Sequence, residues 1–296
     1  MGKQRALGDV ESLGSRHQVN NRMRAPTIAF AAALLIAGEA SAQAPTAPAA
    51  APTPQVSAFL GGQSRECPKC DLTDANLARR DLAGANLSGA ILIGAQLVEA
   101  NLAGANLSDA DLTEADMSLA NLRQANLHGA ILHSAVLYLT DLTLADMSDI
   151  YMRGGMLVRA RMQRANLTGA FIIESDMREI RIAGATMTGA NLGGSKLNDA
   201  VLVDLDLRGV NLEVTDMVAA NLTGANLEGA NLRQADLYGA NLFEAKLKGA
   251  DFTEARLQAA NVIGANLHEA IFKDTLLPDG ETHTGPLAPR VQVTPR

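Results

Sequence analysis

An apolar residue recurs at every fifth position from Leu72 to Leu277, and this register never slips. Of these 42 positions, 30 hold Leu, and the position two residues before each holds Ala in 30 cases. The residue between them is Asn or Asp in 26 units, so the repeating unit reads Ala-(Asn/Asp)-Leu-x-x. A period of five fits neither the helical period of about 3.6 residues nor a long alternating strand. It predicts a short extended segment followed by a turn, repeated along a solenoid.

The unit predicts a side of the chain for each residue. Ala and Leu, two positions apart, point to the same side of an extended segment and form the interior. The Asn or Asp between them points outward, where its short polar side chain can bond backbone groups at the corner. Large apolar residues at this outward position recur mostly at multiples of 20 residues, as Ile131, Tyr151 and Phe171 do. This spacing favours a coil of 20 residues.

The repeat resembles the pentapeptide-repeat family over residues 71–277, most clearly in the segments ANLTGANLEGA and ANLRQADLYGA. The resemblance implies an all-β fold, a right-handed quadrilateral parallel β-helix with four units in each coil. Forty-two units then make about ten coils, and at about 4.8 Å per stacked strand the rod is about 50 Å long. We assign residues 67–280 to this β-helix.

The residues before the repeat indicate export. Residues 22–42 contain a basic start, a short apolar run and an Ala-x-Ala site, which is the order found in a Sec-type signal peptide. We assign residues 1–42 to this signal, with cleavage after Ala42 and a periplasmic or secreted product. A start at Met23, with residues 1–22 upstream of the protein, stays open beside the earlier start. The apolar run is too short to cross a bilayer, so we expect no membrane span in the mature protein.

The segments that flank the repeat favour flexible structure. Residues 43–66 begin as an uncharged Ala/Pro-rich stretch, which is typical of an extended linker. Residues 281–296 are polar and contain Pro, which is typical of a flexible tail. Cys67 falls in the Leu register and Cys70 in the Ala register, so both can point inward. In an oxidising compartment they are expected to form a disulfide that ties off the first coil.

Several inward positions depart from the consensus. Arg80 occupies an Ala position, and because a buried unpaired charge is costly, we expect loose first coils there or a side chain that reaches solvent. Between residues 140 and 217, larger residues replace Ala and Met replaces Leu, which predicts an interior that is repacked around adaptable methionines. At the C-terminal end bulky residues are expected to seal the interior, namely Ile271, Phe272, Leu276 and Leu277.

The sequence contains no arrangement of residues that points to catalysis. The five His residues do not converge on a four-sided rod, and Cys67 and Cys70 lack the second ligand pair that zinc requires. Phosphate-binding loops and calcium-binding repeat motifs are missing. We therefore expect no enzymatic activity, no catalytic residue, no metal site and no cofactor.

A binding surface is expected on two adjacent faces of the rod. Their outward positions carry large apolar side chains within residues 131–178, and a contiguous apolar patch usually marks an interface. The patch predicts contact with an unidentified protein or with a second copy of the chain. Alternatively, its aromatic side chains only shield strand edges or stack on each other. The residues are Ile131, Val136, Tyr138, Tyr151, Met156, Val158, Phe171 and Ile173.

The charge of the repeat supports a second hypothesis. Residues 71–280 hold 27 acidic and 16 basic side chains, and the resemblance implies that an acidic rod of this family can mimic DNA and protect gyrase. The signal peptide and the arginines midway along the rod oppose this function. Among them, Arg161 and Arg181 are expected to stack on one face, where they either contact an anionic partner or balance nearby acids.

The function most consistent with the sequence is that of an exported, non-catalytic scaffold or protein-interaction module. The alternatives are the gyrase-directed DNA mimic and a structural spacer of the cell envelope. In none of these do we expect direct binding of nucleic acid, because the chain carries a net charge of −7.

Overall fold

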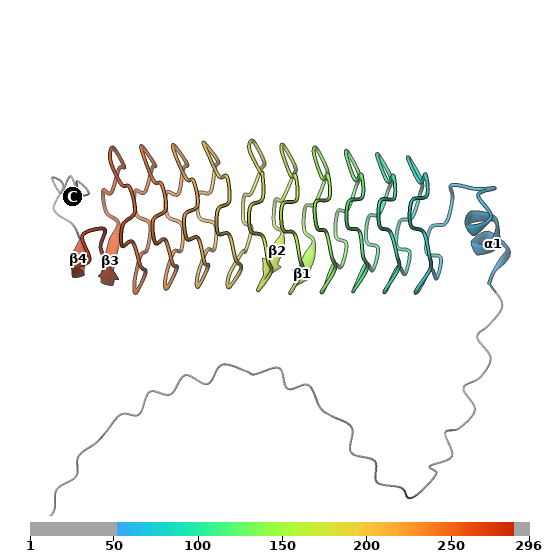
Figure 1. Cartoon of the computed structure of the whole chain (residues 1–296), viewed down its shortest axis with the longest axis horizontal. Coiled ribbons are helices and arrows are strands. Elements are labelled where there is room, and N and C mark those ends of the chain that lie inside the picture. Colours follow the sequence, from blue (N-terminus) through green and yellow to red (C-terminus); the bar gives the residue numbers. More distant parts are fainter. Residues whose placement is uncertain (1–51, 287–296) are drawn as a thin grey trace, which may run out of the picture. The chain divides into compact units, whose positions relative to one another are not determined.

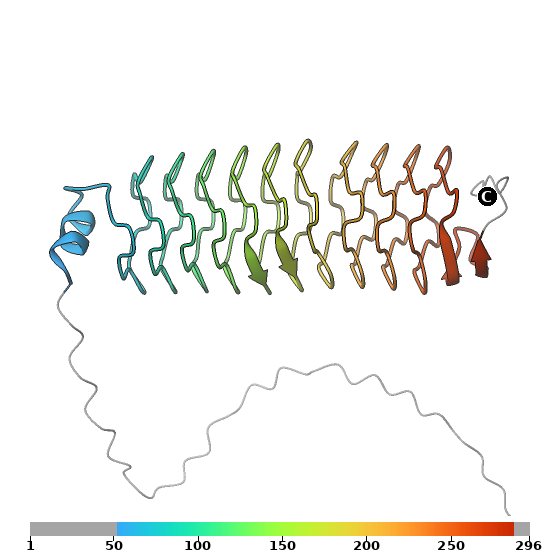
Figure 2. The same ribbon diagram turned by 180° about the vertical axis from the view of Figure 1, so that it is seen from behind.

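The structure, a computed structural model, describes residues 52–286, so the predicted signal peptide and residues 43–51 of the predicted linker lie outside the described residues. Its regular elements are α1 (Pro54–Leu60), β1 (Tyr151–Arg153), β2 (Phe171–Ile173), β3 (Ile271–Leu276) and β4 (Thr282–Pro286). Between α1 and β4 the chain winds into a regular stack of coils (Figure 1). The same stack viewed from behind shows the coils following one another along its axis, with a wider gap on the C-terminal side of β2 (Figure 2).

Each coil contains 20 residues. Parallel β-bridges join residues 20 apart, beginning with Glu66 and Asn86 and ending with Arg256 and Leu276. Backbone hydrogen bonds between neighbouring coils run in both directions. The Leu82 amide donates to the Asn101 carbonyl at 2.7 Å, and the Asn101 amide donates to the Arg80 carbonyl at 2.9 Å. The predicted coil of four pentapeptides is confirmed, and the fold is a four-sided parallel β-helix.

The four faces are named here after the residues that one coil places outward. The Tyr151 face contains the bridge residues 71, 91 and so on to 271, and the Met156 face follows it along the chain. The Arg161 face and the Asn166 face complete the coil. A residue and its neighbour 20 positions on therefore lie one above the other on the same face.

A tight turn separates one face from the next. The Ala85 amide donates to the Leu82 carbonyl at 3.0 Å, and Gly84 just before it has a φ of 64°. This is the hydrogen bond and the left-handed residue of a type II turn. Non-glycine residues such as Arg79, with a φ of 60°, also adopt this conformation, at a cost of about 1–2 kcal/mol each. The stacked coils must therefore hold them in place.

The interior consists of the Leu and Ala side chains of the unit, which are buried along the rod. The methionines at Leu positions and the larger residues at Ala positions are buried as well, as predicted. Gly155 shows how they fit together, because a Cβ atom there would lie 2.4 Å from the Met152 Sδ. The Met152 side chain thus fills the space that an Ala would occupy. The large residues at Ala positions are Ile150, Ile180, Leu205 and Val210.

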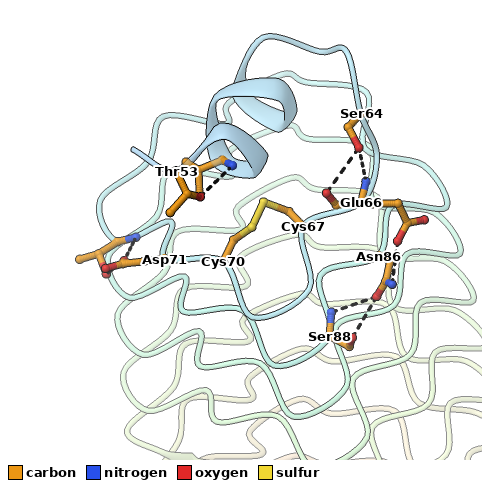
Figure 3. Close-up of a disulfide and its surroundings, with 10 residues drawn as sticks. Thr53, Ser64, Glu66, Cys67, Cys70, Asp71, Asn86 and Ser88 are labelled. Carbon is orange, nitrogen blue, oxygen red and sulfur yellow. Dashed lines mark hydrogen bonds between the residues drawn. A yellow bond between two sulfur atoms is a disulfide. The ribbon is translucent and has the colours of Figure 1, made fainter. Parts of the chain in front are cut away.

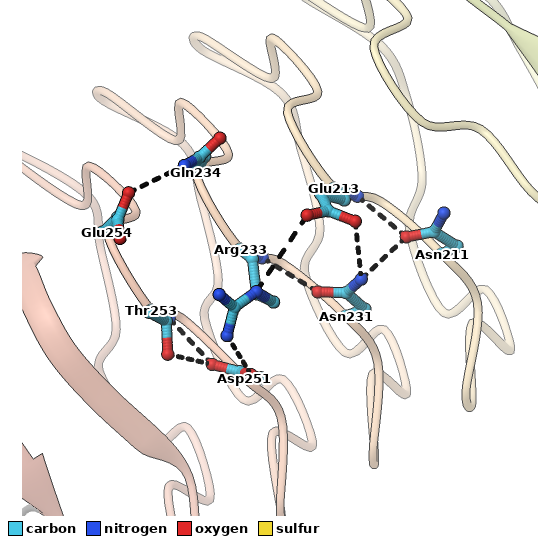
Figure 4. Close-up of polar contacts among 8 residues, drawn as sticks. All are labelled: Asn211, Glu213, Asn231, Arg233, Gln234, Asp251, Thr253 and Glu254. Carbon is cyan, nitrogen blue, oxygen red and sulfur yellow. Dashed lines mark hydrogen bonds and ion pairs between the residues drawn. The ribbon is translucent and has the colours of Figure 1, made fainter.

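The outward Asn residues make two kinds of hydrogen bond (Figure 4). The Asn211 Oδ1 accepts from the Glu213 amide at 3.2 Å, which ties the side chain to its own turn. The same oxygen accepts from the Asn231 Nδ2 at 2.9 Å, which joins it to the next coil. The predicted bond between the polar side chain and the corner is confirmed. Since Asn has both a donor and an acceptor, it can continue this ladder from coil to coil.

Strands β1 and β2 occur where the usual turn is altered. The Gly155 amide donates to the Ser175 Oγ at 3.1 Å, and the Ser175 amide donates to the Ser195 Oγ at 3.1 Å. Both amides bond a hydroxyl of the next coil in place of the turn carbonyl. The three residues before each of these two turns remain extended and form β1 and β2. The two strands pair in parallel, with Tyr151 beside Phe171 and Arg153 beside Ile173.

The N-terminal end of the rod is covered by α1, so the prediction of a linker through residue 66 is wrong for the part that begins at Pro54 (Figure 3). Thr53 caps this helix, because its Oγ1 accepts from the Val56 amide at 3.3 Å. Val56 and Phe59 are buried. The Ala/Pro-rich composition concealed these two residues, whose apolar side chains close the open end of the first coil.

Two further features complete the N-terminal end. Cys67 and Cys70 are joined by a disulfide with a Cα–Cα distance of 5.3 Å, and both are buried in the first coil (Figure 3). Arg80 is only half-buried. Its Nη2 donates to the Phe59 carbonyl at 3.1 Å, and its guanidinium lies 5.9 Å from the centre of the Phe59 ring. The charge at this Ala position therefore leaves the interior and holds the last turn of α1.

At the C-terminal end β4 pairs antiparallel with β3, with Ile271 beside Pro286 and Leu276 beside Thr282. The prediction of a flexible tail from residue 281 is therefore wrong for residues 282–286. Pairing covers a strand edge that would otherwise be open to association. The interior is sealed by Phe272 and Leu277, and the Phe272 ring stacks on Phe252 with centroids 5.3 Å apart. Ile271, which was expected to help seal the interior, is exposed.

Several Asp carboxylates on the rod surface, Asp146 and Asp251 among them, have pKa values below the usual range. Burial alone raises the pKa of Asp251, but the hydroxyl and amide of Thr253 and the guanidinium of Arg233 outweigh it and lower the pKa (Figure 4). The Thr253 amide donates to the Asp251 Oδ1 at 2.9 Å. Asp146 has the same balance, with burial opposed by the hydroxyl and amide of Ser148, and its pKa is also lowered.

We predict that Phe59→Ala lowers the free energy of unfolding by about 3 kcal/mol, because it opens a cavity over the first coil. Denaturant unfolding measures this change, and hydrogen exchange locates it at the Cys67 and Lys69 amides, which bond the next coil. The exposed neighbour Leu60 supplies the control, since Leu60→Ala removes little buried surface. Equal effects of the two substitutions would show that α1 does not cap the rod.

We predict that the rod loses stability in acid. Because these folded-state pKa values lie below those of the unfolded chain, the stabilisation is present above about pH 4 and is lost as the pH falls further. Denaturant unfolding from pH 7 to pH 2 measures the loss. Asp251→Asn keeps an acceptor for Thr253 but cannot titrate, so we expect a smaller loss in this variant. A free energy of unfolding that rises in acid would contradict the prediction.

Candidate protein-interaction surface

The eight apolar residues expected to form a binding surface all lie outside the buried interior, on two neighbouring faces. Tyr151, Met156 and Phe171 are the most exposed, with 55%, 46% and 37% of their surface accessible. The other five are half-buried. The Tyr151 face carries Ile131, Tyr151, Phe171 and Ile173, and the Met156 face carries Val136, Tyr138, Met156 and Val158.

Two exposed leucines enlarge the surface beyond the sequence prediction. Leu119 and Leu139 are 49% and 39% exposed and occupy the left-handed position of turns that end the Met156 face. They lie one coil apart, beside Val136 and Tyr138. The eight predicted residues occupy outward positions within the extended segments, whereas these two leucines lie in turns. An apolar residue at a turn position, where Gly or a polar residue is usual, is the signal that would have identified them.

The surface bends around one edge of the rod. The Tyr151 face and the Met156 face meet at the turn residues Ser134, Gly154 and Glu174, which share a column. The two halves therefore point in different directions. A flat partner can cover one of them at a time, whereas a partner that contacts both must wrap around the edge.

The two aromatic side chains of the Tyr151 face contact each other. Their ring centroids are 6.4 Å apart, and the rings are tilted by 42°. This spacing follows from the parallel pairing of β1 and β2, which places the two residues side by side. The two rings thus contact each other, as the alternative interpretation of the patch allowed, in a tilted arrangement. This contact leaves an outer surface of both rings accessible, so contact between the rings and contact with a partner do not exclude each other.

Charged residues around the surface are paired. The Arg153 Nε lies 2.9 Å from the Glu174 Oε2, and the Arg159 Nε lies 2.8 Å from the Glu179 Oε2. Both pairs connect the coil of Tyr151 with the coil of Phe171. On the Met156 face, the hydrogen bonds of Arg178 lower the pKa of Asp176, and the two side chains are 2.6 Å apart. These exposed pairs contribute little stability but set the pattern of charge at the surface.

The two arginines proposed as an anion site lie on the Arg161 face. Arg161 and Arg181 are bridge partners one coil apart, as expected. The Arg161 Nη1 lies 3.8 Å from the Asp141 Oδ2, so this arginine balances a nearby acid. Arg181 makes no ion pair within residues 52–286. The structure thus supports the charge-balancing alternative for Arg161.

Within residues 52–286, no group of three His, Cys, Asp or Glu side chains is arranged to hold a metal ion. His128 and His133 lie on different faces, where the His128 Nδ1 is 3.0 Å from the Ser148 Oγ and the His133 Nδ1 accepts from the Arg153 amide at 3.2 Å. No helix in this part of the chain is long and apolar enough to cross a membrane.

Solved structures similar to this one are pentapeptide repeat proteins. HetL of the cyanobacterium Nostoc sp. strain PCC 7120, which is involved in heterocyst differentiation regulation, is 27% identical over 77% of this chain and 97% of its own, with a TM-score of 0.42. QnrB1, a plasmid-mediated fluoroquinolone resistance protein, is 18% identical over 66% of this chain and 90% of its own, with a TM-score of 0.40. A search of curated proteins finds no match.

The family model of pentapeptide repeats matches this chain in eight copies. The matched segments run from residue 70 to residue 274, and only residues 144 and 214 within this range are unmatched. They cover more than half of the 296 residues. The repeat unit, the 20-residue coil and this match lead to the same conclusion. The chain belongs to the pentapeptide-repeat family and folds as a right-handed quadrilateral β-helix.

Proposed function

We propose that this protein is an exported, non-catalytic interaction module that binds a partner protein through the Tyr151 and Met156 faces. The observation that carries the proposal is the group of large apolar side chains that remains exposed on a rod whose other outward positions are mostly Asn, Asp, Ser, Thr and Arg. Tyr151 and Met156 are about half exposed although the consensus at their positions is Asn or Asp. An exposed apolar cluster rimmed by polar residues is typical of a protein interface.

The chemistry of the surface suits a protein partner. Aromatic residues and Met are enriched at the centres of protein interfaces, and Tyr is common among the residues that dominate binding energy. Arg153 and Arg159 lie beside the apolar residues, and each is neutralised by a glutamate of the next coil. A partner therefore meets apolar surface without having to remove water from an isolated charge.

Export follows from the sequence of residues 1–42 and places the partner outside the cytoplasm. The Cys67–Cys70 disulfide suits an oxidising compartment. We predict that fractionation of the producing cells recovers a periplasmic or extracellular protein, and that intact mass gives a product beginning at Gln43. An unprocessed cytoplasmic product would overturn the proposed export. A gyrase supercoiling assay would then test the acidic rod as a DNA mimic.

We predict that the double substitution Tyr151→Asn and Phe171→Asn leaves folding intact but abolishes partner binding. Asn is the consensus at both outward positions, so the free energy of unfolding should change by less than about 1 kcal/mol. Loss of two central aromatics should weaken binding by at least about 30-fold. A photo-crosslinking side chain at Met156, introduced in the producing cell, captures the partner, and adduct yield compares the variants.

The matched control places the same change on another face. Val201 and Ile263 lie on the Arg161 face and are 40% and 46% exposed, so Val201→Asn with Ile263→Asn removes a similar apolar surface. The control should keep the adduct. Equal adduct yields from the wild type and both double variants would show that the Tyr151 face binds no partner.

A further inference from the structure

The charged residues beside the apolar part of the Tyr151 face have a direction along the rod. Arg153 belongs to the coil of Tyr151, and Glu174 belongs to the coil of Phe171. They form two hydrogen bonds, from Nε at 2.9 Å and from Nη2 at 3.1 Å. Along the rod axis, the positive residue therefore stands at the coil of Tyr151 and the negative residue at the coil of Phe171. A surface with this polarity is complementary to itself when it is turned end over end.

We propose that the partner of the Tyr151 face is a second copy of this chain, bound antiparallel about a two-fold axis that lies between the levels of Tyr151 and Phe171. This deepens the proposed function and rests on it. In this arrangement each residue lies opposite the one equally far beyond the axis, so Tyr151 of one copy meets Phe171 of the other. The same symmetry brings Arg153 of each copy next to Glu174 of the other. Such an interface is isologous, as in most two-fold dimers.

The local backbone supports this use of the face. β1 and β2 are the two paired strands at the axis, and they keep three residues extended where most coils form a single bridge residue. The buried hydroxyls of Ser175 and Ser195 hold the two strands extended, because they accept hydrogen bonds from the amides of the two altered turns. The apolar and charged residues of the interface therefore stand on a regular surface held from the interior.

The position of the axis allows long overlap. Bridge residues of this face run from 71 to 271, so an axis between 151 and 171 pairs residue 71 of one copy with residue 251 of the other. Ile131 then lies opposite Asn191, and Asp111 lies opposite Asn211. At about 4.8 Å per coil the overlap is about 40 Å long, while three extended residues give a width of about 10 Å. Asp71 opposite Asp251 is the one pair of like charges among these positions.

This footprint is small for a specific interface, because stable complexes bury about 800 Å² on each partner. We therefore expect a dimer that dissociates in the micromolar range. Its two most exposed aromatics, Tyr151 and Phe171, lie at the centre of the contact, where residues that dominate binding are usually found.

Sedimentation of the full purified chain between about 1 and 100 μM tests the proposal over the concentrations typical of weak specific complexes. We expect the mass to rise towards twice that of the monomer. Tyr151→Asn with Phe171→Asn should abolish this rise, and the control Val201→Asn with Ile263→Asn should keep it. A protein that remains monomeric, or a dimer unaffected by the first pair of substitutions, would overturn the proposal.

Exchange of charge tests the antiparallel arrangement. Arg153→Glu and Glu174→Arg should each prevent self-association, because like charges then meet across the axis. An equimolar mixture of the two variants should associate again, since an acidic side chain of one variant then faces a basic side chain of the other at both contacts. In a parallel dimer like charges would already face each other in the wild type, so neither single substitution would weaken association. Failure of the mixture to associate would therefore rule out the antiparallel arrangement.

An engineered disulfide reports the register. In a chain with Ile131→Cys and Asn191→Cys the two new thiols are three coils apart, about 14 Å, so they cannot join within one chain. Across the proposed axis they lie opposite each other, and mild oxidation should give a covalent dimer. If the protein is monomeric while Met156 still crosslinks to another protein, the dimer is wrong and the proposed function stands. If neither contact forms, both fail.

Discussion

The hydrogen bonds between residues one coil apart are the interaction on which the rest of the structure depends. Each coil contributes only short extended segments, and a single bridge of that kind is too weak to persist alone. Stacking repeats it on four faces at every level, from Glu66 to Leu276. The stack also holds left-handed turn residues such as Arg79 and Glu99, whose conformation is unfavourable in an isolated peptide. A solenoid of this kind is stable because neighbours support each other.

The same stacking decides what the surface can display. Since the coil backbone is satisfied by its neighbours, an outward side chain is needed only to complete its turn and to meet the residue above and below. Asn does both, as Asn211 and Asn231 do. Where the outward residue is Tyr151 or Phe171, this polar ladder is interrupted, and the buried hydroxyls of Ser175 and Ser195 take up the turn amides. A change in the interior thus accompanies the exposed aromatics on the outside.

A stack has two ends, and each needs its own solution. At the N-terminal end, Phe59 covers the interior, Arg80 holds the carbonyl of that residue, and the Cys67–Cys70 disulfide lies in the first coil. At the C-terminal end the chain reverses, and β4 pairs with β3 in the opposite direction to every other strand. Both devices stop growth of the sheet by contacts that the repeat itself cannot supply.

The sequence by itself determined the period, the interior and the coil, because one register repeats 42 times and each repeat sees the same neighbours. Val56 and Phe59 lie in a segment without that register, so only the tertiary structure decided that they cap the first coil. The antiparallel pairing of Thr282–Pro286, the exit of Arg80 from an inward position and the exposed Leu119 were decided in the same way. Each depends on a contact with residues far along the chain or on the direction of one side chain, and a local repeat carries no record of either.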